Sequence, residues 1–155
     1  MTHGKESGGR LADFLSHEDP QQLYGKLQKL DEGCFGVVYK AQNVKTNEWV
    51  AIKVIQIKQD TKLETIESEI AMMQSCKHEN IVNYYGTYSV QNDLWIVMEL
   101  VEGGKLTDIL MKTRFSEDEI ACVTKYSLLA LKYLHDTKRI HRDIKSDNIL
   151  LGKYI

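Results

Sequence analysis

The sequence lacks the features that mark secreted, disulfide-rich or membrane-spanning proteins. It has one proline, Pro20, and its three cysteines, Cys34, Cys76 and Cys122, lie far apart without paired spacing. This cysteine usage predicts neither a zinc site nor a disulfide framework and favours a reducing compartment. No apolar run approaches the roughly 18 residues of a membrane span, and no apolar stretch follows the polar N-terminus as in a secretory signal. We therefore expect a soluble protein of the cytoplasm.

A strong charge of either sign is also missing. The formal net charge is -2, which gives no electrostatic reason to expect binding to nucleic acid or to an anionic membrane. Apolar residues make up 43% and charged residues 27% of the 155 positions, which is ordinary for a globular protein. The length suits one domain with a core of its own.

The patterns that are present predict a mixed α and β fold. β-branched and aromatic runs indicate strands, and apolar residues at helical spacing after the capping boxes Thr61–Glu64 and Ser116–Glu119 indicate helices. Residues 1–20 are expected to be a flexible lead-in. The predicted strands are 24–30, 37–42, 49–55, 81–88 and 94–99, with a hairpin at 43–48, and the predicted helices are 61–76, 106–111 and about 116–135.

The densest set of reactive residue types lies in the segment His141-Arg142-Asp143-Ile144-Lys145-Ser146-Asp147-Asn148. Asp143 supplies a carboxylate able to accept a hydroxyl proton, and Asn148 supplies an amide oxygen of the kind that Mg²⁺ binds. The segment matches the protein-kinase catalytic loop H-R-D-x-x-x-x-N. The alternative is a charged surface turn.

A second segment, Leu30 to Val38, lies between two predicted strands and resembles the glycine-rich loop G-x-G-x-x-G-x-V that covers ATP phosphates. Gly33 and Gly36 occupy two of the three glycine positions, whereas Asp31 replaces the first, which is expected to weaken nucleotide binding. An ordinary hairpin turn is the alternative. The nucleotide-contacting positions predicted here are Asp31, Gly33, Cys34, Phe35, Gly36 and Val38.

The run Val50-Ala51-Ile52-Lys53 matches the kinase motif V-A-I-K. Lys53 would neutralise phosphate charge, although a lysine guarding an edge strand is the alternative. Glu69 lies near the apolar stripe of the predicted helix, where a carboxylate needs a cation, and Lys53 is the candidate. Glu67 is expected to be solvated.

An apolar strand from Leu94 runs into the glycine pair Gly103-Gly104. By resemblance to kinases, Met98 would guard the back of an adenine pocket, and the backbones of Glu99 and Val101 would hydrogen-bond the base. Without the other motifs the segment is simply a buried strand and a turn. Ala51 and Leu150 complete the predicted nucleotide-binding set.

Together these motifs identify the chain as a member of the eukaryotic protein kinases. The segments 83–88, 94–99, 103–110 and 140–152 resemble the sterile-twenty-like group, and within it the p21-activated kinases. The resemblance implies an α+β fold with a complete five-stranded antiparallel N-lobe and one helix (about 21–99), a hinge (about 100–104) and the first part of a helical C-lobe (about 105–155), with ATP in the cleft.

The resemblance also implies a reaction, transfer of the ATP γ-phosphate to Ser/Thr hydroxyls of proteins in intracellular signalling, with Mg²⁺ as cofactor and small-GTPase-linked regulators. Asp143 would be the general base, Lys145 would stabilise the transferred phosphoryl group and Asn148 would hold Mg²⁺, with Lys53 and Glu69 completing the catalytic set. The 155 residues contain no D-F-G motif, so we expect the chain alone to be an impaired kinase. The alternative is a nucleotide-binding or interaction module, or a fragment without function. By the same resemblance, the apolar face of the long helix (Ile120, Val123, Leu128, Leu131 and Leu134) packs partly on helices that these 155 residues do not contain and partly on the catalytic loop, so we expect part of it to be exposed.

Overall fold

The computed structural model describes residues 10–33 and 36–152, so the predicted contacts of Cys34 and Phe35 lie outside the described residues. The chain divides into two compact units. The first contains the chain up to Ser75 and the segment Asn83–Leu100, and the second contains Cys76–Val82 and the chain from Val101 onward. Each unit is described by itself.

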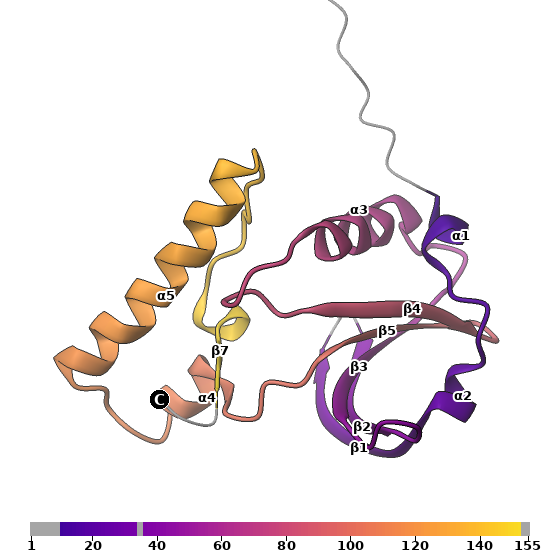
Figure 1. The fold of residues 1–155 in the computed structure, drawn as a ribbon, viewed down its shortest axis with the longest axis horizontal. Helices are drawn as coiled ribbons and strands as arrows, with labels where there is room; N and C mark the ends of the chain where they lie inside the picture. Colours follow the sequence, from indigo (N-terminus) through magenta and orange to yellow (C-terminus); the bar gives the residue numbers. More distant parts are fainter. Residues whose placement is uncertain (1–9, 34–35, 153–155) are drawn as a thin grey trace, which may run out of the picture. The chain divides into compact units, whose positions relative to one another are not determined.

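The first unit is built on a five-stranded antiparallel sheet in the order β1-β2-β3-β5-β4 (Figure 1). This confirms the predicted sheet. The strands are β1 Tyr24–Gly33, β2 Gly36–Asn43, β3 Trp49–Gln56, β4 Tyr84–Val90 and β5 Asp93–Glu99. Each strand therefore pairs with its neighbour in sequence except β3, whose next partner is β5.

The two faces of the sheet bury separate apolar clusters. Because strand side chains alternate, Ile52 and Val97 belong to the cluster on one face, whereas Ile55 and Ile96 belong to the cluster on the other. Helix α3, Leu63–Ser75, covers the second cluster and contributes the buried Ile70. Lys53 shares the strand parity of Ile55, so its side chain is directed to the face that α3 covers.

Residues 10–23, most of which were expected to belong to a flexible lead-in, have defined structure in the first unit. They form the short helices α1 Leu11–Phe14 and α2 Pro20–Leu23. The Leu11 amide donates to Glu67 Oε1 at 2.6 Å, and the Ser16 amide donates to the Thr87 carbonyl at 2.8 Å. The prediction that Glu67 is only solvated was therefore wrong, because its carboxylate accepts a backbone hydrogen bond from the N-terminal segment.

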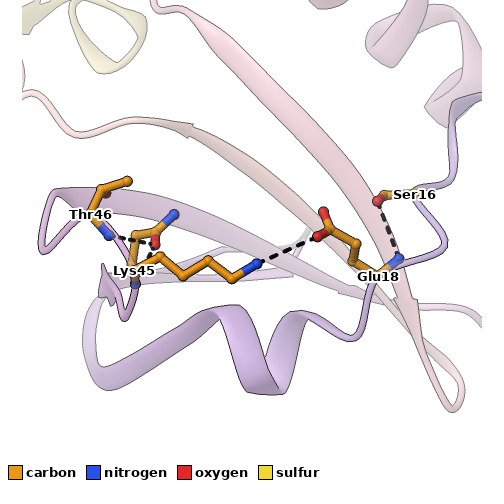
Figure 2. A network of polar contacts seen from close by, with 5 residues as sticks. Ser16, Glu18, Lys45 and Thr46 are labelled. Atoms are coloured by element: carbon orange, nitrogen blue, oxygen red, sulfur yellow. Dashed lines mark hydrogen bonds and ion pairs between the residues drawn. The ribbon is translucent and has the colours of Figure 1, made fainter.

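The same segment is also joined to the hairpin between β2 and β3. Figure 2 shows Lys45 of this hairpin reaching Glu18, with Nζ and Oε1 3.8 Å apart, while the Glu18 amide donates to Ser16 Oγ at 3.4 Å. Asp19 caps α2 by accepting a hydrogen bond from the Gln21 amide at 2.9 Å. The segment is thus held by backbone hydrogen bonds and by Leu11, Phe14 and Leu15, which pack against the apolar cluster beneath α3, whereas the exposed ion pair adds little.

Two predicted element boundaries were wrong. Helix α3 begins at Leu63, and the Thr61 hydroxyl accepts a hydrogen bond from the preceding Lys58 amide instead of forming the predicted capping box. Strand β4 begins at Tyr84 and not at residue 81, because the Ile81 amide is turned back onto the His78 carbonyl. In both cases a polar group that the pattern assigned to a helix or a strand forms its hydrogen bond in a local turn instead.

The second unit is helical. It contains α4 Leu106–Leu110, α5 Glu117–Asp136, a short 3₁₀ turn Ser146–Asn148, and the two-residue strands β6 Gly104–Lys105 and β7 Leu150–Leu151, which pair antiparallel. The predicted capping box of α5 is confirmed, since the Ser116 amide donates to Glu119 at 2.7 Å and the Glu119 amide donates to Ser116 Oγ.

The apolar face predicted to be exposed on α5 is divided between two environments. Leu134 is 4% exposed and therefore buried, Val123 and Leu131 are half-buried, and Ile120 and Leu128 are 49% and 58% exposed. Leu134 therefore belongs to the part of the face that stays covered, and Ile120 and Leu128 belong to the exposed part. No helix in the described part of the chain is long and apolar enough to span a membrane.

Candidate active site

The turn between β1 and β2 contains a glycine that no other residue can replace without strain. Gly36 has φ +125°, and a Cβ at this position would lie 2.2 Å from the Val54 carbonyl oxygen on β3. Gly33, which pairs with Gly36 in the ladder, has open space around it. Asp31 pairs with Val38 after a bulge in β1 and is half-buried. The close approach of β2 to β3 therefore explains the requirement for glycine at position 36 without any ligand.

The predicted pair of Lys53 and Glu69 is present as an ion pair. Lys53 Nζ lies 2.8 Å from Glu69 Oε1, and the two side chains are 20% and 46% exposed. Lys53 comes from the middle of β3, and Glu69 comes from α3, where it lies one residue before the buried Ile70. The sheet and the helix thus hold an ammonium group in a defined position while leaving part of it open to solvent.

Four of the predicted nucleotide-binding residues are neighbours in the sheet. Val38 is opposite Lys53 across the β2–β3 ladder, and Ala51 is opposite Met98 across the β3–β5 ladder. Met98 packs against the buried cluster beneath α3. The pairing brings these side chains together from positions up to 60 residues apart in the sequence (38 to 98).

The Glu99 amide is already engaged, since it donates to the Asn83 carbonyl at 2.9 Å. The Glu99 carboxylate accepts two further hydrogen bonds from Asn83, one from the amide and one from Nδ2. If the backbone of Glu99 binds a base, as predicted, this amide is not the group that does so. Val101 is half-buried and Leu150 is 39% exposed, and both belong to the second unit.

In the second unit, polar contacts converge on Asp143. Asn148 Nδ2 donates to Asp143 Oδ2 at 2.9 Å and to its carbonyl oxygen at 2.8 Å, and Lys145 Nζ lies 3.0 Å from Oδ2. Hydrogen bonds from Lys145 and then from Asn148 lower the pKa of Asp143 below its ordinary value. The side chain is 63% exposed. Asp143 is therefore an ionised carboxylate that faces solvent and is held by two neighbours.

The backbone around Asp143 is anchored by contacts that the sequence analysis did not identify. Thr107 Oγ1 on α4 donates to Ser146 Oγ at 2.6 Å, and the Leu106 amide donates to the Ile149 carbonyl at 2.8 Å. A Cβ on Gly103 would lie 2.2 Å from the Leu151 carbonyl oxygen. The glycine pair Gly103-Gly104, interpreted from the sequence only as a break in the chain, is the sequence feature that indicates the close approach of the β6 and β7 segments.

Arg142, next to Asp143, has a left-handed backbone with φ +66°. Non-glycine residues rarely adopt this conformation and pay a conformational cost for it. The Asp143 amide donates to His141 Nδ1 at 3.3 Å across this bend. The strained residue therefore directs the chain so that Asp143, Lys145 and Asn148 meet.

The side chain of Asn148 fits the ligand role predicted for it. Because both of its hydrogen bonds to Asp143 use Nδ2, the amide oxygen is the atom left for a cation, and Mg²⁺ prefers oxygen ligands. Within residues 10–33 and 36–152, no three His, Cys, Asp or Glu side chains gather as a metal-binding cluster. A single ligand from Asn148 would suit an ion held largely by substrate phosphates and water.

Comparison with known proteins shows the family to which this chain belongs. The family model "Protein kinase domain" matches residues 24–154. The chain is 46% identical over 143 residues to serine/threonine-protein kinase PAK 1 of Mus musculus, covering 92% of this chain and 26% of that protein. It is 47% identical over 151 residues to serine/threonine-protein kinase pakC of Dictyostelium discoideum, covering 95% of this chain and 31% of that protein.

A third relative, serine/threonine-protein kinase STE20 of Eremothecium gossypii, is 44% identical over 143 residues, which cover 92% of this chain and 15% of that protein. The chain thus spans between 15% and 31% of the length of these curated relatives. The similarity confirms the resemblance to the sterile-twenty-like and p21-activated kinases. The chain belongs to the protein kinase domain family.

Proposed function

We propose that the chain is the nucleotide-binding and catalytic-loop portion of a serine/threonine protein kinase of the sterile-twenty-like group. The reaction would be transfer of the ATP γ-phosphate to Ser/Thr hydroxyls of protein substrates. The observation that carries the proposal is the ionised, solvent-facing Asp143 held by Lys145 and Asn148. The relatives named as serine/threonine-protein kinases support the same reaction.

The residues of the second unit suit proton acceptance and charge stabilisation. Asp143 is ionised at neutral pH and exposed, so its carboxylate can orient a substrate hydroxyl and accept its proton. Lys145 already lies beside this carboxylate and can stabilise negative charge on the transferred group. Asn148 would hold Mg²⁺ through its amide oxygen. When bound, Mg²⁺ neutralises phosphate charge and orients the phosphate oxygens.

The residues of the first unit suit nucleotide binding. Lys53 would neutralise charge on the α- and β-phosphates, and its ion pair with Glu69 holds the ammonium group in place. The β1–β2 turn, with Asp31, Gly33, Cys34, Phe35, Gly36 and Val38, would cover the phosphates. Ala51, Met98, Glu99, Val101 and Leu150 would contact the base.

The wider assignments rest on family resemblance alone. We propose that the protein acts in the cytoplasm on protein substrates and that small-GTPase-linked regulators control it. The match to p21-activated kinases supports this assignment of regulators. The chain's own residues support the catalytic roles proposed above and do not define a particular substrate.

The direct test is phosphate transfer from labelled ATP with Mg²⁺ to a generic basic protein. Removing a general base costs about 10²–10⁴-fold in rate, so Asp143→Asn should lower the rate by that factor. Asp147→Asn is the matched control, because it makes the same charge change at an exposed position of the same loop. Equal rates for Asp143→Asn and the unsubstituted protein would refute the assignment. Nucleotide binding by folded protein without transfer would favour the nucleotide-binding module instead.

A further inference from the structure

Helix α3 is joined to the N-terminal segment by a polar contact that the proposed reaction does not use. Glu67 Oε1 on α3 accepts a hydrogen bond from the Leu11 amide at 2.6 Å, and the contact is partly buried. Leu11 is the first residue of α1, so its amide is one of the donors that the start of a helix leaves without a partner inside the helix. Figure 1 shows α1 beside α3 in the first unit. Glu67 therefore fixes the start of α1 against α3.

The same segment is fastened to the sheet at its other end. The Ser16 amide donates to the Thr87 carbonyl of the edge strand β4 at 2.8 Å, and Leu15 forms a parallel bridge with Thr87. Between the two ends, half-buried apolar side chains of the segment pack against the cluster beneath α3. We call residues 11–16 the N-terminal strap. The strap thus links α3 to β4 through hydrogen bonds at both ends and apolar packing between them.

Glu67 and Glu69 flank the buried side of α3. Ile66 and Ile70 are the buried residues of this helix and face the sheet. Because successive helix residues are about 100° apart around the axis, the two carboxylates fall on opposite sides of the stripe that Ile66 and Ile70 form. Apolar packing has no preferred direction and resists rotation of a helix about its axis only weakly. The hydrogen-bonded carboxylates on the two flanks therefore fix the rotation of α3.

A small rotation of α3 is enough to separate Glu69 from Lys53. Glu69 Oε1 and Lys53 Nζ are 2.8 Å apart. A side-chain atom about 5 Å from the helix axis moves by roughly 2 Å when the helix turns by about 20°, and a hydrogen bond stretched by that amount is lost. The contact of Glu67 with the N-terminal strap therefore bears directly on the position of the Lys53 ammonium group.

We propose that Glu67 is a positioning residue for Lys53: by binding the N-terminal strap, it holds α3 in the rotation that pairs Glu69 with Lys53. Glu67 acts through Glu69 and not on a nucleotide. The consequence for nucleotide binding rests on the proposed function, in which Lys53 neutralises phosphate charge. The geometric part of the proposal does not, and it is tested separately.

The accessibility of Lys53 is measured without a nucleotide, as the rate at which acetic anhydride modifies Lys53 in the 155-residue chain, followed by mass spectrometry. The paired Lys53 side chain is 20% exposed, so release from Glu69 should raise this rate. Glu67→Ala should raise it by roughly twofold or more, toward the rate of Glu69→Gln. Glu67→Gln keeps an acceptor oxygen and should stay near the unsubstituted rate. Glu64→Ala is the matched control, because it removes a carboxylate at an exposed position of the same helix.

A second variant breaks the same contact from the other side. Leu11→Pro removes the donor amide at the first position of α1, where proline is tolerated, and Arg10 before it already has the extended ψ of 153° that proline requires. It should raise the acetylation rate of Lys53 as Glu67→Ala does. The exposed Lys62 is the internal reference, because unfolding of a variant would change the rates of Lys53 and Lys62 alike with respect to a denatured sample.

A double-mutant cycle separates positioning from a general loss of stability. If Glu67 acts through the ion pair, Glu67→Ala should not raise the acetylation rate of Lys53 further in the Glu69→Gln background. An unchanged rate in both Glu67→Ala and Leu11→Pro would overturn the proposal. An effect of Glu67→Ala that is equally large with and without Glu69 would overturn it as well.

ATP binding in the presence of Mg²⁺, measured by isothermal titration calorimetry, tests the consequence for the proposed function. Glu67→Ala should raise the Kd of ATP by roughly threefold to tenfold, and Glu67→Gln should leave it near the unsubstituted value. An unchanged Kd together with a raised acetylation rate of Lys53 would refute the role of Glu67 in nucleotide binding. If the unsubstituted chain binds no ATP, the proposed nucleotide site is refuted, and the acetylation rates still decide whether Glu67 positions Lys53.

Discussion

Replacing Gly36 by alanine should destabilise the first unit strongly. The Cβ of alanine would lie 2.2 Å from the Val54 carbonyl oxygen, whereas real Cβ contacts essentially never fall below 3.0 Å. The obstacle is the backbone of β3, which cannot rotate away as a side chain can. Strands β2 and β3 would have to separate next to the Val37–Val54 pair of the ladder.

The magnitude follows from two contributions. A non-glycine residue at φ +125° costs about 1–3 kcal/mol in backbone strain. Separation of the strands weakens one or two ladder hydrogen bonds, each with a net contribution of about 1 kcal/mol. The expected loss is therefore about 2–5 kcal/mol of unfolding free energy, a large part of the roughly 5–15 kcal/mol that stabilises a typical domain.

Urea unfolding followed by tryptophan fluorescence measures this loss. Both tryptophans, Trp49 on β3 and Trp95 on β5, belong to the first unit, so the signal reports its unfolding. At a urea dependence of about 2 kcal/mol per M, the middle of the usual range, the midpoint should fall by roughly 1–2.5 M. Gly33→Ala is the control, because a Cβ there meets no atom within 4 Å. Equal midpoints for the two variants would refute the reasoning.

Two further predictions concern the second unit. Ser116→Ala removes the side-chain cap of α5 and should cost about 1 kcal/mol of unfolding free energy, measured by urea titration of far-UV circular dichroism. Thr124→Ala, at an exposed position inside the helix, is its control, and an equal effect of both substitutions would contradict the role of the cap. Lys145→Met should raise the pKa of Asp143 toward the usual value of about 3.9, because Lys145 is the main cause of its lowering, and carboxyl-carbon NMR titration measures this. Because the pKa is lowered by folding, Asp143 stabilises the fold above its unfolded-state pKa and loses this effect as the pH falls through its folded-state pKa. An unchanged titration in Lys145→Met would contradict the assignment.

Much of the regular structure was predictable because its signals are local. Alternating apolar residues located the strands, and the sequence from Ser116 to Glu119 located the start of α5 correctly. The same reasoning was wrong at Thr61, because a threonine hydroxyl can accept a hydrogen bond from a backbone amide in a turn as readily as from one at the start of a helix. In the structure it accepts from the Lys58 amide in the turn before α3. The contacts of residues 10–20 were not predictable from the segment itself, because they depend on the distant Glu67 and Thr87 and on an apolar cluster formed by other elements.

The residue types of the candidate site were also predictable, since the motifs carry them in fixed order. Their mutual geometry was predictable only in part. The pairing of Lys53 with Glu69 followed from the need of a carboxylate near an apolar face for a cation, and the structure confirms it at 2.8 Å. The left-handed backbone of Arg142 has no signal in the sequence, because it is imposed by the path of the surrounding chain.

The sequence by itself determined which residues are apolar, which can carry charge and where helices and strands can start, because these properties depend on near neighbours. The tertiary structure alone decided the insertion of β5 between β3 and β4, the close approach that requires Gly36, and the contacts of Leu106 and Thr107 that anchor the backbone around Asp143. It also decided which face of α5 is buried and which remains open. These outcomes depend on atoms from segments far apart in the chain, and periodicity within one segment carries no information about them.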